Sequence, residues 1–207
     1  MTLYGAVEAG GTKFVVAIGE APEAPREVVR IETSSTPLDT VAEVIRYFEG
    51  QPPLAALGVA TFGPVDFATG SITTTPKAGW QDFPLRDALA QALHLPVGFD
   101  TDVNGAALAE ARCGAAKGLD DVVYFTVGTG IGGGVLSGGR LVHGLMHSEM
   151  GHLLVRRAPG EREAFQGVCP YHHDCLEGMA SGPAMEARWG VKADELPSDH
   201  DAWRIEA

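Results

Sequence analysis

The sequence predicts an α/β fold, and three observations support that prediction. Short runs rich in valine and isoleucine alternate with segments whose apolar residues recur at helical spacing. A pattern of strand, glycine turn and strand occurs twice. The 207 residues are 45% hydrophobic and 20% charged, which is typical of a soluble protein with one large domain or two modest ones.

The first half of the chain is predicted to hold most of the strands. The opening "LYGAVEAGGTKFVVAIGE" indicates a strand, a turn at Gly10 and Gly11, and a second strand. A helix over 36–50 follows from Thr36 at the N-cap, Pro37 in the first turn and Gly50 as the stop. The other elements predicted in this half are strands at 26–33, 54–63, 70–80 (running into a loop) and 95–102, and a helix at 84–94.

The second half begins with a predicted helix over 104–114, which ends at Gly114. Residues 120–144 then repeat the opening pattern of strand, glycine turn and strand. His152 is predicted to open a short strand over 152–155. The acidic stretch "DELPSDHDAW" begins a further predicted helix, at which the chain stops without a cap, so we expect a truncated second domain.

The charge and cysteine content exclude several classes of protein. A formal net charge of −12 repels phosphate backbones and anionic lipid, so neither nucleic acid nor a membrane is an expected partner. Glycine and glutamate residues interrupt any secretory apolar run near the N-terminus. Three cysteines are an odd number for a disulfide framework, so cytoplasmic thiols are expected, and clustered Cys and His residues there more often bind metal.

The two glycine turns are candidate phosphate-binding sites. "TVGTGIGG" has the spacing of a dinucleotide-binding motif, but that motif requires a following helix, and "GGGVLSGG" cannot start one. "GGTK" also lacks the spacing of a Walker loop. Successive backbone N–H groups in a glycine turn can bind an anion, and Thr12, Lys13 and Thr129 add donors. A tight hairpin without a ligand is the alternative for either turn alone, whereas the two together favour phosphate binding.

Two aspartates lie where a predicted strand gives way to a helix, in "FDTDVNGAALAE". Asp100 and Asp102 could cap the helix, which is the structural explanation. The functional explanation is a general base at the carboxyl end of a strand, taking the proton from a sugar hydroxyl that attacks a phosphoryl group. The pattern alone leaves both explanations open.

The stretch "CPYHHDC" is a candidate zinc site, because Cys169, His172 and Cys175 follow the spacing C-x2-H-x2-C. Zinc takes four ligands, and "HSEMGH" offers the fourth as His147 or His152, of which His152 is the firmer candidate. A loop with free thiols and surface histidines is the alternative. Such an ion would bring Glu149 and Glu177 together, and two carboxylates beside an imidazole suit the hydroxyls of a polyol. Cys113 is expected to be a small apolar residue and not a ligand.

Taken together, these segments resemble the ROK family of sugar kinases (named for repressor, open reading frame, kinase), and most of all its zinc-dependent bacterial fructokinase branch. "EAGGTK", with Glu8 where most of the family has Asp, and "TVGTGIGGG" are similar to its two phosphate motifs. "DTDVNGAALAE" resembles its catalytic segment, with Thr101 in place of the usual Asn. "HSEMGH" carries its E-x-G-H motif, and "CPYHHDCLEGMASGPA" resembles its zinc loop, with His172 in place of one cysteine.

The resemblance implies a role for each candidate residue. Asp102 is the implied catalytic base. The implied phosphate and ATP contacts are Gly10, Gly11, Thr12, Lys13, Gly128, Thr129 and Gly130. The implied sugar contacts are Thr101, Glu149, His152 and Glu177, and the implied zinc ligands are His152, Cys169, His172 and Cys175.

The resemblance spans essentially the whole chain and implies an actin-like, ribonuclease H-like fold. We expect an N-terminal domain over 1–112 and a second domain that begins at 113 and continues to 207. The second domain is expected to be incomplete, because family members run considerably further. The implied reaction is ATP-dependent phosphorylation of a hexose, fructose foremost, with a structural Zn²⁺ and with Mg²⁺ bridging the phosphates near Glu8. Dimers are common among such kinases, so the resemblance makes a homodimer one possibility, and the sequence leaves the oligomeric state open.

Three alternatives to this function follow from the same residues. The family also includes transcriptional repressors, so a non-catalytic sugar sensor is one of them. Those proteins carry a DNA-binding helix-turn-helix ahead of the first glycine motif, and here that motif begins near residue 1. This position and the acidic net charge both argue against a repressor. A zinc-binding interaction module would explain only "CPYHHDC". A kinase for glucose or mannose differs only in the sugar, which the sequence does not decide.

Overall fold

The computed structural model of the chain describes residues 1–144, 147–157 and 165–200. The chain divides into two compact units, and the polypeptide passes between them three times, after Val122, after Gly133 and after His147. Unit 1 comprises Met1–Val122 and Gly134–His147, and unit 2 comprises Val123–Gly133 and Ser148–Ala207. In the described part of the chain, no helix is both long enough and apolar enough to cross a bilayer.

Unit 1 is built on a five-stranded sheet in the order β3-β2-β1-β4-β7. Strands β1, β2 and β3 are antiparallel neighbours, whereas β4 pairs in parallel with both β1 and β7. The bounds are β1 Leu3–Ala9, β2 Lys13–Gly19, β3 Arg26–Glu32, β4 Leu54–Thr61 and β7 Val97–Thr101. The antiparallel pair β1–β2 confirms the first predicted strand, glycine turn and strand.

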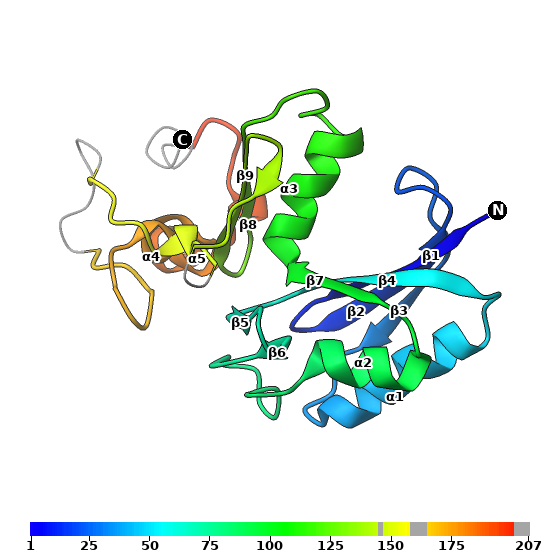
Figure 1. Cartoon of the computed structure of the whole chain (residues 1–207). Coiled ribbons are helices and arrows are strands. Elements are labelled where there is room, and N and C mark those ends of the chain that lie inside the picture. Colours follow the sequence, from blue (N-terminus) through cyan, green and yellow to red (C-terminus); the bar gives the residue numbers. More distant parts are fainter. Residues whose placement is uncertain (145–146, 158–164, 201–207) are drawn as a thin grey trace. The chain divides into compact units, whose positions relative to one another are not determined.

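Three helices cover this sheet. Figure 1 shows α1 (Pro37–Glu49) and α2 (Leu85–Leu93) on one face and α3 (Asp102–Cys113) on the other. Helix α1 begins after Thr36 and ends at Gly50, as predicted. Helix α3 begins at Asp102, two residues before the predicted start, because the Thr101 side chain accepts a hydrogen bond from the Asn104 N–H and serves as the N-cap.

The core of unit 1 lies between the sheet and helices α1 and α2. Its largest members are aromatic: Trp80 stacks edge-on against Phe62 and Phe83 and at a tilt against Phe14. Trp80 is fully buried, and its indole N–H donates to the Ser34 carbonyl at 2.8 Å. The predicted strand over 70–80 is much shorter than expected, because only Ser71–Ile72 (β6) pairs with Val65–Asp66 (β5).

The second half of the chain supplies a three-stranded sheet in the order β10-β9-β8. Its strands are β8 Val122–Val127, β9 Ile131–Ser137 and β10 Arg140–Leu141, which confirms the second predicted strand, glycine turn and strand. The remaining elements are the 3-10 helix η1 Met150–His152, helices α4 Leu176–Ala180 and α5 Gly182–Trp189, and the 3-10 helix η2 Ala193–Glu195.

The predicted strand over 152–155 is wrong. His152 ends η1, and only Leu154 forms an isolated antiparallel bridge, with Cys175. The partner of this segment is a short loop and not a strand, so the pairing stops after the Leu176 N–H donates to the Leu153 carbonyl at 2.8 Å. The helix predicted from "DELPSDHDAW" is described only as η2, and residues 201–207 lie outside the described residues.

Candidate functional site

The turn between β1 and β2, called here the first hairpin (residues 10–12), is fastened from the end of β3. The Gly10 N–H donates to the Lys13 carbonyl at 2.9 Å, which closes the turn. The buried Thr33 donates two hydrogen bonds to this turn. Its N–H donates to the Thr12 carbonyl at 3.0 Å, and its Oγ1 donates to the Gly10 carbonyl at 2.8 Å. Gly11, Thr12 and Lys13 are left exposed. Sequence patterns did not identify Thr33, which lies more than 20 positions away.

Asp102 occupies the first turn of α3, directly after β7. Its Oδ1 accepts the Val103 N–H at 2.9 Å. Burial raises the pKa of the Asp102 carboxyl; the Val103 hydrogen bond opposes that shift, the Glu8 carboxylate adds to it, and His147 opposes it. Since Thr101 provides the helix cap, capping does not require the Asp102 side chain. A half-buried carboxylate whose pKa is raised in this way is suited to accept a proton.

Asp100 joins the N-terminus of α3 to the segment that follows β10. Its Oδ1 accepts from the Thr101 N–H and from Asn104 Nδ2, both at 2.8 Å, while Oδ2 lies 2.7 Å from His143 Nε2. The buried Asn104 in turn accepts the Val135 N–H at 3.4 Å. Sequence patterns missed this network, because His143 is 43 residues from Asp100 and no local motif connects them.

The turn between β8 and β9, called here the second hairpin (residues 128–130), lies at the start of α5. The Gly128 N–H donates to the Gly130 carbonyl at 2.9 Å, and the Gly182 N–H donates to the Gly128 carbonyl at 2.7 Å. A cavity of about 640 Å³ opens beside this turn, lined by Gly128, Thr129, the first residues of α5 and Lys192. That volume is in the range of small-molecule sites.

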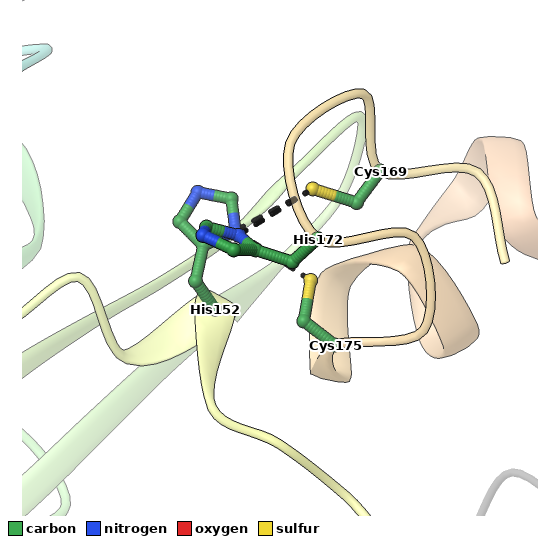
Figure 2. Close-up of side chains that lie close together, drawn as sticks. All are labelled: His152, Cys169, His172 and Cys175. Carbon is green, nitrogen blue, oxygen red and sulfur yellow. Dashed lines mark hydrogen bonds between the residues drawn. The ribbon is translucent and has the colours of Figure 1, made fainter.

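Four side chains of unit 2 converge on one point, as Figure 2 shows: His152, Cys169, His172 and Cys175, called here the Cys/His cluster. Nδ1 of His152 lies 3.6 Å from Cys169 Sγ and 3.5 Å from Cys175 Sγ. Nδ1 of His172 lies 4.0 Å from Cys169 Sγ, and all four ligand atoms lie within 4.8 Å of one another. Ligands about 2.0–2.3 Å from a tetrahedral zinc ion are separated by about 3.3–3.8 Å. The two distances from His152 lie in this range, and the wider separations, up to 4.8 Å, would have to shorten for all four atoms to bind one ion.

The loop that carries three of these ligands is closed by its own backbone. Cys169 and His173 exchange both N–H···O bonds, at 3.3 and 3.0 Å. The His173 carbonyl is so closely enclosed that a Cβ built on Gly167 or Gly178 would lie 2.0 or 1.8 Å from its oxygen. Burial raises the pKa of the Cys175 thiol, and the adjacent Cys169 adds to the shift, so a bound cation is what would hold the sulfur as thiolate.

The two predicted sugar-binding carboxylates of unit 2 differ in their surroundings. Glu149 is exposed, in the left-handed backbone region, and its Oε2 lies 3.9 Å from Nε2 of His152. His152 therefore faces the sulfurs through Nδ1 and the carboxylate through Nε2. Glu177, the second residue of α4, accepts the Ile131 N–H at 2.9 Å through its Oε2. The contact between Glu177 and the second hairpin has no counterpart in the sequence-based prediction.

The predicted site residues are divided between the two units. Unit 1 holds the first hairpin, Thr101 and Asp102, and unit 2 holds the second hairpin, the two glutamates and the Cys/His cluster. Thr101 is buried, and its hydroxyl is already engaged as the cap of α3. His147, the other candidate for the fourth zinc ligand, belongs to unit 1 and is not in the Cys/His cluster. Cys113 is a free thiol on α3, half-buried, outside that cluster.

An α/β fold with two glycine hairpins, a half-buried carboxylate at a strand end and a Cys/His cluster defines a class of sugar-kinase-like proteins. Comparison with known families is in agreement. Residues 4–202 match the ROK family, and the chain belongs to that family. The resemblance drawn from the motifs is thereby confirmed.

Several similar relatives carry fructokinase names. A protein of Bacillus subtilis (strain 168) described as "Putative fructokinase" is 50% identical over 210 residues, covering 99% of this chain and 69% of the relative. The "Fructokinase" of Lactococcus lactis subsp. cremoris is 42% identical over 209 residues, covering 98% of this chain and 69% of the relative. This chain therefore spans about two thirds of the length of these proteins.

Solved structures confirm the predicted actin-like fold. The ROK hexokinase of Thermus thermophilus superposes with a TM-score of 0.79 at 32% identity, covering 99% of this chain and 72% of that one. A ROK glucokinase from Streptomyces griseus, solved with glucose and AMPPNP, superposes with a TM-score of 0.74 at 30% identity. This chain covers 59% of that glucokinase, and 89% of this chain is aligned.

Proposed function

We propose that the protein catalyses transfer of the γ-phosphoryl group of ATP to a hydroxyl of a hexose, with fructose as the substrate and fructose 6-phosphate as the product. The observation that carries the proposal is the half-buried carboxylate of Asp102 at the end of a parallel strand, with a raised pKa, in a chain 42–50% identical to proteins named as fructokinases. A second hexose, glucose, is favoured by one observation, the glucose bound in the Streptomyces griseus glucokinase.

In this proposal, Asp102 accepts the proton of the attacking hydroxyl. The sugar oxygen forms a new bond to the γ-phosphorus, the bond from that phosphorus to the β,γ-bridging oxygen breaks, and ADP leaves with the electron pair. The raised pKa keeps the carboxylate a better base than an exposed aspartate, which favours the transfer. Most of the acceleration is expected from positioning and from stabilisation of the phosphoryl charge.

The two glycine hairpins are proposed to bind the phosphates. The exposed Gly11, Thr12 and Lys13 present N–H, hydroxyl and ammonium donors in unit 1, and Gly128 to Gly130 present theirs in unit 2. The cavity beside the second hairpin has the size to accept part of a nucleotide. Mg²⁺, when bound, would neutralise phosphate charge; the carboxylate of Glu8, close enough to raise the pKa of Asp102, offers the hard oxygen donors that this ion prefers.

The sugar is proposed to contact Glu149, His152 and Glu177 of unit 2. Zinc, when bound by the Cys/His cluster, would have a structural role, because the cluster provides four protein ligands and leaves no position for a substrate. Nδ1 of His152 would bind the ion, and Nε2, on the side of Glu149, would face the sugar hydroxyls. In this way the metal would orient a substrate-binding imidazole.

A coupled assay of ADP release on the full-length protein, with fructose, glucose and mannose in parallel, tests the proposal. We expect ADP release that depends on sugar, with the highest kcat/KM for fructose. A higher kcat/KM for glucose would keep the kinase and replace the substrate. Binding of sugar without any ADP release would instead identify a sugar sensor, and no sugar binding at all would leave only the zinc module.

A further inference from the structure

The second hairpin is held at both of its ends by the helices that follow the Cys/His loop. At one end, the Gly182 N–H of α5 donates to the Gly128 carbonyl at 2.7 Å. At the other end, the Ile131 N–H donates to Oε2 of Glu177, on α4, at 2.9 Å. A Cβ on Gly130 would lie 2.7 Å from that oxygen, so glycine at this position is what admits the carboxylate.

A short segment with successive hydrogen bonds, residues 175–184, links these two contacts to the Cys/His cluster. Cys175 is both a member of the cluster and the N-cap of α4, where its Sγ accepts the Gly178 N–H at 3.5 Å. Its carbonyl accepts the Met179 N–H at 2.9 Å. Ser181 then ends α4 and caps α5 by accepting the Ala184 N–H at 3.4 Å. The position of Glu177 is therefore fixed two residues from a cluster sulfur.

We propose that Glu177 is a positioning residue for the second hairpin, and that the Cys/His cluster sets nucleotide affinity through it. The inference rests on the proposed function, and it adds to the sugar contact a role toward the phosphate side of the reaction. A glycine turn binds phosphate only when its N–H groups point the same way, and a free Gly-Thr-Gly turn loses much conformational entropy when it is ordered. A turn already fixed by the carboxylate does not incur this cost on binding.

Glu177 is suited to fixing the second hairpin, because a carboxylate that accepts a backbone N–H forms a charge-assisted hydrogen bond. The competing effect is repulsion, since a negative charge beside a phosphate site weakens nucleotide binding. The two effects have opposite signs, so they can be separated by replacing the carboxylate with a neutral acceptor. Glutamine keeps an oxygen that can accept the Ile131 N–H, whereas alanine removes it.

The first test measures the Kd of AMPPNP with Mg²⁺, without sugar, by calorimetry on the zinc-loaded, full-length protein. We expect Glu177→Ala to raise the Kd about ten-fold, which is the usual effect of losing one hydrogen bond to a charged group. Glu177→Gln should restore a Kd close to that of the unmodified protein. Asp199→Ala, which removes an exposed carboxylate of the same unit, should leave it unchanged.

An unchanged or lower Kd in Glu177→Ala would overturn the positioning role, and the glutamate would then remain a sugar contact at most. Fructose affinity, measured on the same variants, separates the two roles, because a pure sugar contact changes only that quantity. Absence of AMPPNP binding by the unmodified protein would overturn the proposed kinase function together with this inference. Circular dichroism and zinc content show whether each variant is folded.

The second test addresses the metal. Removing zinc with a zinc-selective chelator, with Mg²⁺ then restored, should raise the AMPPNP Kd by a factor similar to that of Glu177→Ala. In the protein that has both changes the two factors should not multiply, because they act through one path. Factors that multiply would show that the metal and Glu177 act independently, which would overturn the coupling.

Discussion

The two compact units hold their functional side chains by different means. Unit 1 supports Asp102 and the first hairpin on a sheet with an extensive apolar core, in which Phe14, Trp80 and Leu89 are fully buried. Among the described residues of unit 2, the apolar cluster comprises Met185 and Leu196 with two partly buried neighbours. The alternate residues Val123, Phe125 and Val127 of β8 are 55%, 42% and 64% exposed.

The difference shows two ways of positioning a site. Burial of apolar area is non-directional and fixes whole elements, so in unit 1 the site residues depend on where strands and helices end. In unit 2 the site residues depend on directional contacts, which are the convergence of sulfur and imidazole on one point and the hydrogen bond from Ile131 to Glu177. We therefore expect substitution of a site residue in unit 1 to abolish activity while the unit stays folded. In unit 2 we expect substitution of a site residue to impair both binding and local structure.

The largest effect is expected at Asp102. Asp102→Asn should lower kcat by about 10²–10⁴, the range for loss of a general base, while fructose affinity and the circular dichroism spectrum are retained. Asp87→Asn, at a half-exposed position of α2, is the matched control and should keep full turnover. Near-normal turnover of Asp102→Asn would show that another group accepts the proton.

The same carboxylate predicts a pH dependence. The pKa of Asp102 is raised in the folded state, so that state binds the proton more tightly than the unfolded chain does. Its contribution to stability is greatest below the pKa of an ordinary aspartate and is lost as pH rises through the raised value. We expect Asp102→Asn to unfold at a higher temperature than the unmodified protein at neutral pH, with the difference vanishing in acid. Thermal unfolding across pH measures both; an equal difference at all pH values would contradict the assignment.

The next effect compares the two cores by one substitution. Leu89→Ala removes a fully buried side chain from unit 1 and should lower the free energy of unfolding by about 2–5 kcal/mol. Leu196→Ala, in the small cluster of unit 2, should cost about half as much or less, because fewer apolar neighbours lose a contact. Denaturant titration measures both values. Equal losses would mean that the apolar contacts of unit 2 matter as much as those of unit 1.

Metal removal is the complementary test of unit 2. Cys175→Ser should release zinc, weaken fructose binding and lower the amide protection of residues 150–157 and 165–181 on the order of a hundred-fold. The strands of unit 1 should exchange as before, since their order does not depend on the cluster. Cys113→Ser is the matched control on α3 and should retain zinc. Retention of zinc by Cys175→Ser would remove this residue from the ligand set.

The smallest effect is expected at the network that sequence patterns missed. His143→Ala removes the contact to Oδ2 of Asp100, and because the pair is partly exposed we expect a fall of about five-fold in kcat with little change in KM. Asp100→Asn should have a larger effect, since this side chain also accepts from Thr101 and Asn104. Steady-state kinetics distinguish the two, and equal effects would place the whole contribution in the His143 contact.

Local patterns predicted the parts of the molecule that depend on neighbours in the sequence. The spacing in the sequence predicts the hairpins at Gly10 and Gly128 and the three cluster residues of "CPYHHDC". His152 is predicted as the fourth because zinc takes four ligands. The missed contacts join residues far apart in the chain: Thr33 to Gly10, His143 to Asp100, and Ile131 to Glu177 at a separation of 46. No periodicity encodes such pairs, because they arise only when distant elements pack.

The predicted division into domains over 1–112 and 113–207 remains a prediction, since compactness alone groups residues 134–147 with the first unit. The residue roles in catalysis and in sugar, phosphate and zinc binding also remain predictions. Their chemistry is consistent with the geometry of each unit, and the experiments above measure each role separately.

The enclosed His173 carbonyl has a consequence for grafting the loop of residues 167–178 onto another protein. The three cluster residues of the loop at their correct spacing would not be enough, because any side chain at 167 or 178 would collide with that oxygen. The portable fragment therefore extends from Gly167 to Gly178 and must be grafted beside a segment equivalent to residues 152–154. A library that varies the loop should hold both glycines fixed and can vary the exposed Tyr171 among aromatic residues, because its ring packs beside His152 and His172.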